Sequence, residues 1–326
     1  MKKFSYKYYL LLIVFIFVNQ IFAQNSDFTQ FHTNRLYTNI AFSGMQQCPQ
    51  LYTSYRTKHT ELEGGYVSAF ASIDGYMSMI EGDVSIKVLH DIQQNILHST
   101  GAIMSYAKEY KLRKHLFLKA ALGAGFTNNS LFNSQLVFSD MLHPLYGVVK
   151  ESDENKIANS QMFFDSELGC LVYNMNFYAG LSIKHLNHFF SYARNKNIPY
   201  VPVFSAHAGT EFSNSKGFER KGAIWFYPHI NVTVSRLSSY IQSNMIVMLS
   251  QLQTGIGYRQ NFPISNETFV IFVGFVEKKY KFAYNCDVEI KSKIGKNFKT
   301  HELSFTYQFD CIGRRKKQGA VKAPGY

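Results

Sequence analysis

Beyond its first two dozen residues, the sequence lacks any long, uninterrupted hydrophobic run. After Val18 no window supplies the roughly 18 consecutive apolar residues that a helix needs to cross a bilayer. Charged residues are also scarce, at 17% of the chain, against about 25% in an average soluble domain. These two shortages exclude a bundle of membrane-spanning helices and fit poorly with a typical soluble enzyme.

The spacing of the cysteines excludes the usual metal and redox motifs. The four cysteines are Cys48, Cys170, Cys286 and Cys311, and no pair has two-residue spacing. Disulfides are permitted if the protein is exported. Cys170 and Cys286 fall on predicted lipid-facing strand faces, where a lone thiol acts as a small hydrophobic group.

Motifs that would indicate catalysis are missing as well. His301-Glu302 begins like a zinc-protease helix, but Phe305 stands where the second histidine would be. Two short Gly-x-Gly segments, at residues 123–125 and 255–257, do not continue into the full phosphate-binding fingerprint. We therefore predict no catalytic, cofactor-binding or metal-binding residues and no enzymatic activity, and an outer-membrane hydrolase is only a distant alternative.

The N-terminus has the features of a secretory signal peptide. Lys2, Lys3 and Lys7 precede an apolar stretch over residues 9–18, and Ala23 then offers a small residue before Gln24. This arrangement predicts cleavage after Ala23, with residues 1–23 removed. A purely periplasmic or secreted protein is the alternative that the leader alone leaves open.

The positive charge of the chain is concentrated at its ends. The net charge is +12; the leader holds three of these charges and the C-terminal tail, residues 311–326, holds five, which leaves +4 on residues 24–310. The five tail residues are Arg314, Arg315, Lys316, Lys317 and Lys322. Without a clustered basic face, nucleic-acid binding is not expected. The tail is predicted either to be a disordered end without a role or to contact anionic lipid, peptidoglycan or an acidic partner.

Apolar and polar residues alternate along most of the chain. In residues 301–309, Leu303, Phe305, Tyr307 and Phe309 share one face while Glu302, Ser304, Thr306 and Gln308 share the other. Alternate side chains on a strand point to opposite faces, so this segment has one apolar side and one polar side. Phe and Tyr are abundant and Trp occurs once, which suits strands and the aromatic girdles of a membrane barrel.

The same pattern predicts about fourteen strands. They cover residues 50–56, 65–72, 82–89, 98–107, 116–126, 164–172, 177–184, 201–210, 223–234, 240–249, 252–260, 268–276, 280–289 and 301–309. The fold class is therefore all-β: a transmembrane antiparallel outer-membrane β-barrel of about 12–14 strands, spanning residues 48–310. Residues 24–47 are expected to form a periplasmic N-terminal segment. The longest connections follow the fifth, seventh and thirteenth strands, which places them together on the outer side. The connection over residues 213–222 is an exception, because it is fairly long and would face inward.

Several charged residues are predicted to point into the lumen. They are Asp165, Glu167, Lys184, Lys281, Asp287, Glu289 and Glu302, with Arg56 and Arg259 as possible partners. Because buried charges need partners, a network that braces or plugs the lumen is favoured over a catalytic acid–base pair.

Short motifs spread over the mature chain resemble those of a known family. The matching positions are Asp27, Phe28, Gln30, Phe31, Asn34, Asn39, Ala41, Phe42, Gly44, Tyr55, Arg56, His185, Leu186, Asn187, Tyr258, Arg259, His301 and Glu302. In order and spacing they resemble the PorP/SprF family of type IX secretion system membrane proteins. The sequence departs from the family pattern at Ile40, where the family has proline, and in the residues after Arg56.

The resemblance implies a function without catalysis. It implies an outer-membrane barrel of a Gram-negative bacterium that helps to export or anchor a cell-surface adhesin, or that supports the secretion and gliding apparatus. The implied partners are outer-membrane lipid, type IX secretion components and the C-terminal domain of a surface adhesin, with no cofactor and no nucleic acid. The motif residues would then be structural or partner-binding. The alternative is a channel or transporter for a small or hydrophobic solute, motivated by the polar inward faces and aromatic walls.

Overall fold

The computed structural model describes eleven stretches of the chain. They are residues 27–46, 48–59, 65–131, 141–143, 147–148, 160–187, 201–213, 224–236, 238–262, 266–290 and 298–311. The predicted signal peptide and the five basic residues of the tail lie outside the described residues.

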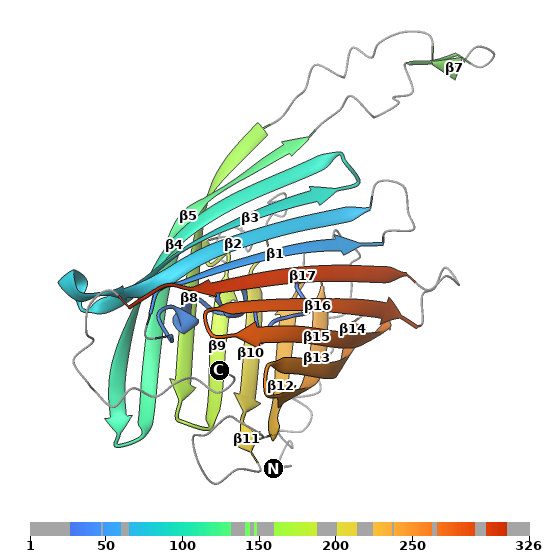
Figure 1. The fold of residues 1–326 in the computed structure, drawn as a ribbon. Helices are drawn as coiled ribbons and strands as arrows, with labels where there is room; N and C mark the ends of the chain where they lie inside the picture. Colours follow the sequence, from blue (N-terminus) through green and yellow to red (C-terminus); the bar gives the residue numbers. More distant parts are fainter. Residues whose placement is uncertain are drawn as a thin grey trace, which may run out of the picture.

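In the described part of the chain, fourteen antiparallel strands close into one barrel (Figure 1). The strands are β1 (Gln50–Lys58), β2 (Tyr66–Met77), β3 (Gly82–Gln93), β4 (Leu97–Arg113), β5 (Leu116–Leu131), β8 (Ser160–Tyr173), β9 (Phe177–Lys184), β10 (Val203–Thr210), β12 (Ile224–Ser235), β13 (Ser239–Leu249), β14 (Leu252–Phe262), β15 (Glu267–Glu277), β16 (Tyr280–Glu289) and β17 (Lys299–Gln308). Each strand pairs with its neighbours along the chain, and β1 pairs with β17 to close the ring. The predicted fold class and the predicted strands are confirmed.

The remaining described elements are short. They are the helices α2 (Arg35–Thr38), η1 (Ile40–Phe42) and η2 (Ser78–Ile80), the strand β11 (Phe212–Ser213) beside β12, and the hairpin of β6 (Leu142–His143) and β7 (Gly147–Val148). No helix among the described residues has the length and apolar content that a membrane crossing requires.

The two ends of the barrel differ in their connections. Tight turns at residues 250–251 and 278–279 join β13 to β14 and β15 to β16, and Ser250 and Lys278 adopt the positive φ angles that such turns need. The long connections after β5, β9 and β16 all lie at the opposite end, while the connection over residues 211–223, between β10 and β12, lies at the end with the tight turns. We call that end the outer end, because outer-membrane barrels carry their long loops on the cell surface.

Large apolar side chains cover the outside of the barrel. Exposed examples on five different strands are Leu122, Leu181, Ile256, Ile271 and Leu303. Their neighbours in sequence point inward, and on β5 Lys119, Ala121 and Gly123 are buried. An apolar surface that surrounds the whole wall requires lipid rather than water as its solvent.

This facing yields a first prediction. In Leu122→Arg a charge replaces a side chain that is 58% exposed on the outer wall. We expect the free energy of unfolding to fall by about 2–4 kcal/mol, the cost of a basic residue near the bilayer midplane. Urea titration of the barrel refolded in lipid vesicles measures it, with Leu122→Phe as the size-matched apolar control. Equal stability of the two variants would place this face away from lipid.

The segment before β1 occupies the lumen and forms a plug, defined here as residues 27–46. Apart from Asp27 and Tyr37, all of its residues are buried. The prediction of a periplasmic segment over residues 24–47 is therefore wrong for this stretch. The physical reason is that a closed ring of strands leaves an interior lined by polar side chains, and an irregular segment there finds partners for its backbone groups.

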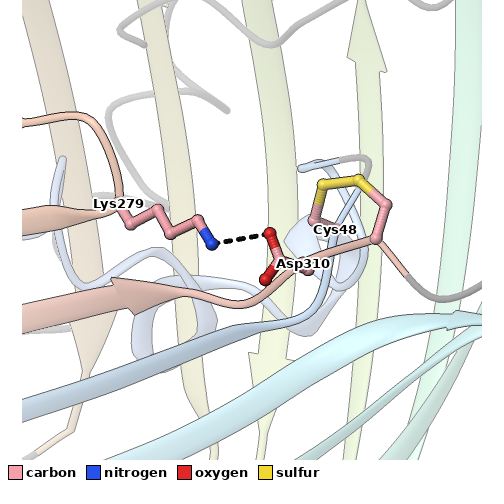
Figure 2. Close-up of a disulfide and its surroundings, with 4 residues drawn as sticks. Cys48, Lys279 and Asp310 are labelled. Atoms are coloured by element: carbon pink, nitrogen blue, oxygen red, sulfur yellow. Dashed lines mark hydrogen bonds and ion pairs between the residues drawn. A yellow bond between two sulfur atoms is a disulfide. The ribbon is translucent and has the colours of Figure 1, made fainter.

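A disulfide joins the two ends of the barrel sequence. Cys48 lies just before β1 and Cys311 lies just after β17, and their sulfur atoms are bonded (Figure 2). Lys279 donates a hydrogen bond of 2.6 Å to Asp310 beside it, and the neighbouring carboxylate raises the pKa of the Lys279 ammonium group. The backbone N–H of Phe309 donates to the carbonyl of Pro49. The bond is thus a covalent seam where the first and last strands meet.

The seam has a measurable consequence. In the double variant Cys48→Ser with Cys311→Ser, we expect the free energy of unfolding to fall by about 2–4 kcal/mol, since a crosslink over a long loop restricts the unfolded chain. The vesicle urea titration measures this effect with and without reductant. Cys170→Ser, which removes a free thiol, is the control. A wild-type protein whose stability does not respond to reductant would contradict the prediction.

Candidate functional site: a plugged lumen

The first residues of the plug are bound by a buried ionic cluster. Arg56 on β1 lies 3.1 Å from Asp287 on β16 and 2.8 Å from Glu302 on β17. Thr29 is held between them: its N–H donates to Glu302 at 2.9 Å, its hydroxyl donates to Asp287 at 2.5 Å, and Arg56 donates to the same hydroxyl. We call Arg56, Asp287 and Glu302 the Thr29 clamp.

The residues on either side of Thr29 are also bound to the wall. The Gln30 amide donates to Asn285 and accepts from the Ser304 hydroxyl at 2.7 Å. Arg259 on β14 donates to the Phe28 carbonyl at 3.3 Å. Gln242 on β13 donates to the Thr29 carbonyl at 2.8 Å, and its own carbonyl accepts from Arg259. Five strands, β1, β13, β14, β16 and β17, therefore hold three plug residues.

The middle of the plug makes a sharp turn against the opposite wall. Asn39 caps η1 by accepting from the Ala41 N–H at 2.8 Å, while its amide donates to the carbonyls of Cys170 and Leu181. A Cβ at Gly169 on β8 would lie 2.1 Å from the Asn39 side chain. The absence of a side chain at residue 169 therefore lets the plug approach the strand directly.

The end of the plug is bound by a second ionic cluster. Lys119 on β5 lies 2.5 Å from Asp83 on β3 and donates to the Ser43 carbonyl. The Gly44 N–H donates to Asp74 at 2.6 Å, and Gly44 has a φ of +61°, which residues with side chains rarely adopt. We call Lys119, Asp83 and Asp74 the Ser43 clamp. The plug is thus tied to the barrel at both ends.

Three buried histidines lie between the clamps, His32 in the plug and His207 and His229 on the barrel wall. The ring of His32 stacks on that of His229 with centroids 5.6 Å apart, and the Asn39 amide lies 3.3 Å from His207. Phe272 contacts His32 edge-on, and Tyr178 lies 3.1 Å from His229. Among the described residues, no group of three or more His, Cys, Asp or Glu side chains is arranged to hold a metal ion.

The motif residues lie in four places in the structure. Those brought together at the plug are Phe28, Gln30, Phe31, Asn34, Asn39, Ala41, Phe42, Gly44, Arg56, Arg259 and Glu302. His185, Leu186 and Asn187 instead bind the outer end of β8, where Asn187 donates to the Phe164 carbonyl at 2.6 Å. Tyr55 and Tyr258 are exposed on the outer wall, and His301 contacts Tyr284 on that face. Asp27 lines the cavity above the plug.

Sequence reasoning missed part of the plug's support. It identified Arg56, Arg259, Asp287 and Glu302 as inward charges, and the structure places all four beside the plug or its first residues. Asp74, Asp83 and Gln242 were not identified. The alternation of the strands could have indicated that such residues face inward: Asp74, for example, follows Ser68, Phe70 and Ser72 at alternate positions of β2. Alternation alone does not show which inward residue contacts the plug.

Comparison with known structures returns barrels of low similarity. The Acinetobacter baumannii outer membrane protein Omp33 aligns at 9% identity with a TM-score of 0.45, over 82% of this chain and all of that chain. The Pseudomonas putida toluene transporter TodX aligns at 8% identity with a TM-score of 0.47, over 87% of this chain and 94% of that one. The Ralstonia pickettii toluene transporter TbuX gives 9% identity and a TM-score of 0.47, over 85% and 94%. At this similarity their activities carry no information about this barrel.

Sequence comparison identifies the family. No curated protein sequence matches the chain. The family model for the type IX secretion system membrane protein PorP/SprF matches residues 21–307, which include the plug and all fourteen barrel strands up to Tyr307. The match begins next to the predicted cleavage site, consistent with a signal peptide and with an outer-membrane location. The chain therefore belongs to the PorP/SprF family of type IX secretion system membrane proteins.

Proposed function

We propose that this barrel is a rigid, non-enzymatic mount in the outer membrane, which helps the type IX secretion system to export a cell-surface adhesin and hold it at the surface. Export of the barrel itself would remove residues 1–23. The observation that carries the proposal is the plug, bound at one end by the Thr29 clamp and at the other by the Ser43 clamp.

The hydrogen bonds between the plug and the two clamps favour a closed, rigid barrel. Arg56 and Lys119 are 5% and 0% exposed, and each is matched with buried carboxylates. These ion pairs join barrel strands to one another, and the plug residues Thr29, Ser43 and Gly44 add hydrogen bonds with the buried charged groups of the clamps. Hydrogen bonds to charged groups are stronger than neutral ones, and a plug that left the lumen would lose them at both ends, which supports a barrel that does not gate open freely.

Family membership supports the choice of partner class. Members of this family act with the type IX secretion system, and a barrel with a filled lumen has its outer-end connections and its periplasmic rim left for protein contacts. The seam formed by Cys48 and Cys311 fixes the start of the basic tail at that rim. We propose the outer connections as the contact with the adhesin and the rim as the contact with the secretion apparatus.

Two measurements on the same preparation test the proposal. An affinity-tagged barrel is purified in mild detergent from its own cells, and the co-purified proteins are identified by mass spectrometry. The barrel is also reconstituted into planar bilayers to measure conductance. We expect a large surface protein with a type IX C-terminal domain among the co-purified proteins, and no steady conductance.

The transport alternative predicts the opposite pair of results. Steady conductance that changes with an added small or hydrophobic solute, with no surface protein recovered, would overturn the mount. The clamp variant Arg56→Met is the positive control for conductance, because it weakens the attachment of the plug while the outer wall stays unchanged.

A further inference from the structure

A cavity of 360 Å³ lies in the lumen between the plug and the outer end of the barrel. Phe28, Phe31 and Tyr37 of the plug line one side of it. The strand residues around it, such as Gln93 and Asn129, lie toward the strand ends that carry the long connections. We call this space the outer cavity. Its volume is within the range of small-ligand sites, about 300–1,000 Å³.

Negative charge dominates the wall of the outer cavity. Among the described residues, its lining holds four carboxylates, Asp27, Asp91, Asp165 and Glu167, against two ammonium groups, those of Lys87 and Lys184. Lys87 is matched with Glu167 at 2.6 Å. His185 lies 2.8 Å from Asp165.

The second ammonium group of the lining rests on an aromatic ring. The Lys184 nitrogen lies 3.5 Å from the centroid of the Tyr37 ring. On the neighbouring wall, the Arg259 guanidinium lies 4.4 Å from the centroid of Tyr240, which also lines the cavity. The aromatic faces of this lumen thus already hold cations, as ring quadrupoles do. Phe28 and Phe31 are further aromatic residues of the same lining.

An independent observation points to a hydrogen-bond donor. Asn231 on β12 lines the outer cavity and is 2% exposed. Its amide nitrogen donates weakly toward Thr233 and Tyr240, but its carbonyl oxygen has no hydrogen-bond partner among the described residues. A buried acceptor left unmatched is costly, so a ligand that donates to it would gain free energy.

We propose that the outer cavity binds one basic side chain, with arginine as the best fit, from a segment of the partner protein presented at the outer end. A guanidinium group supplies a positive charge beside the carboxylates of the lining, N–H donors for the Asn231 carbonyl, and a flat face for the aromatic side chains of Phe28 and Phe31. This inference rests on the proposed function for the source of the segment, and adds the chemistry by which the barrel recognises it.

The chain's own basic tail is a poor occupant. Cys311 is bonded to Cys48 at the start of β1, which lies at the end of the barrel opposite the outer cavity. The plug, held by both clamps, lies between that end and the cavity. The tail therefore starts on the far side of the plug from the outer cavity.

The first arm of the test measures binding of a defined probe. N-acetyl-arginine amide is titrated by calorimetry into the full-length mature barrel in detergent, with N-acetyl-citrulline amide as the neutral probe of the same shape. We expect the arginine probe to bind at least tenfold more tightly than the citrulline probe, and Asp91→Asn to weaken its binding about tenfold, because one carboxylate of the lining loses its charge. Asp27→Asn is the second cavity variant, in case Asp91→Asn does not fold.

A control variant removes a charge elsewhere. Asp310→Asn eliminates one carboxylate at the periplasmic rim, where Asp310 is exposed, and we expect it to leave probe binding unchanged. Equal binding of the two probes, or an equal loss in Asp310→Asn and Asp91→Asn, would overturn the proposal. The proposal would also be overturned if the chain's own terminal amine occupied the cavity. In that case the probe would not bind, and the amine would be protected from acylation in the folded barrel.

The second arm separates this inference from the proposed function. The tagged Asp91→Asn and Asp27→Asn barrels are purified from cells, and the recovered surface protein is compared with that of the wild type and of Asp310→Asn. A surface protein recovered equally with all barrels leaves the mount standing and overturns the cavity as its contact. Probe binding that depends on Asp91 without any recovered surface protein overturns the mount, while the cavity keeps its ligand chemistry.

Discussion

Replacement of Arg56 by methionine is expected to lower the free energy of unfolding by about 3–5 kcal/mol, because it leaves buried carboxylates without their cation. Asp287 and Glu302 are 2% and 0% exposed and both contact Arg56. The same substitution removes one of the three hydrogen bonds that join Thr29 to the clamp. Repulsion between the two carboxylates then weakens the other two clamp bonds, so the plug should loosen at its first residues.

Two measurements follow this loss. Urea titration in lipid vesicles gives the free energy of unfolding, and planar bilayers report whether the lumen conducts once the plug is loosened. The wild type should be silent and the variant should show current. Tyr55→Leu is the matched control, since residue 55 lies on the same strand but is exposed on the outer wall.

A neutralised clamp tests the electrostatic cause. The triple variant Arg56→Met, Asp287→Asn, Glu302→Gln removes all three charges together and should recover most of the lost stability, because buried ion pairs can often be replaced by neutral groups at little cost. If the triple variant is as unstable as Arg56→Met alone, then lost packing rather than unpaired charge explains the effect.

The strands could be predicted from the sequence because lipid imposes a strict rule on them. Every second residue of a barrel strand faces hydrocarbon, so the period-two pattern survives even where single residues deviate. β5 is an example: the predicted face of Leu122 and Phe126 is exposed, and that of Lys119 and Ala121 is buried. Strand ends were less well predicted, since β4 extends to Arg113 and β8 begins at Ser160. Beyond the bilayer the pattern is no longer enforced.

The plug could not be predicted in the same way. Residues 27–46 have neither helical nor strand periodicity, because they are buried on all sides by different strands. Their partners lie far away in sequence: Thr29 and Glu302 are separated by 273 residues. Only the closure of the ring between β1 and β17 brings such residues together. The family motifs contained the partners, but as separate short pieces with no sign that they meet.

The seam was missed for a related reason. Cys48 and Cys311 are separated by 263 residues and have no local spacing that suggests pairing. They become neighbours because a closed antiparallel barrel always places its first strand beside its last. Cysteines just outside these two strands are thus a signal that sequence reasoning can use once a barrel is inferred.

The structure reverses one expectation about the lumen. By face alone, substituting Lys119 should disturb the barrel less than Leu122→Arg, since residue 119 points inward where polar groups are tolerated. However, Lys119 is fully buried, lies 2.5 Å from Asp83 and donates to the Ser43 carbonyl of the plug. An inward position in this barrel is a position in a packed core rather than in water.

We therefore expect Lys119→Met to lower the free energy of unfolding by about 3–5 kcal/mol, at least as much as Leu122→Arg, because the Asp83 carboxylate loses its cation. Urea titration of both variants in the same vesicles ranks them directly. Adding Asp83→Asn to Lys119→Met should restore part of the loss, since the buried charge is then removed; the coupling between the two substitutions measures their interaction. A Lys119→Met barrel of nearly wild-type stability would mean that the Ser43 clamp does not hold the plug, and only the Thr29 clamp would remain to support a rigid mount.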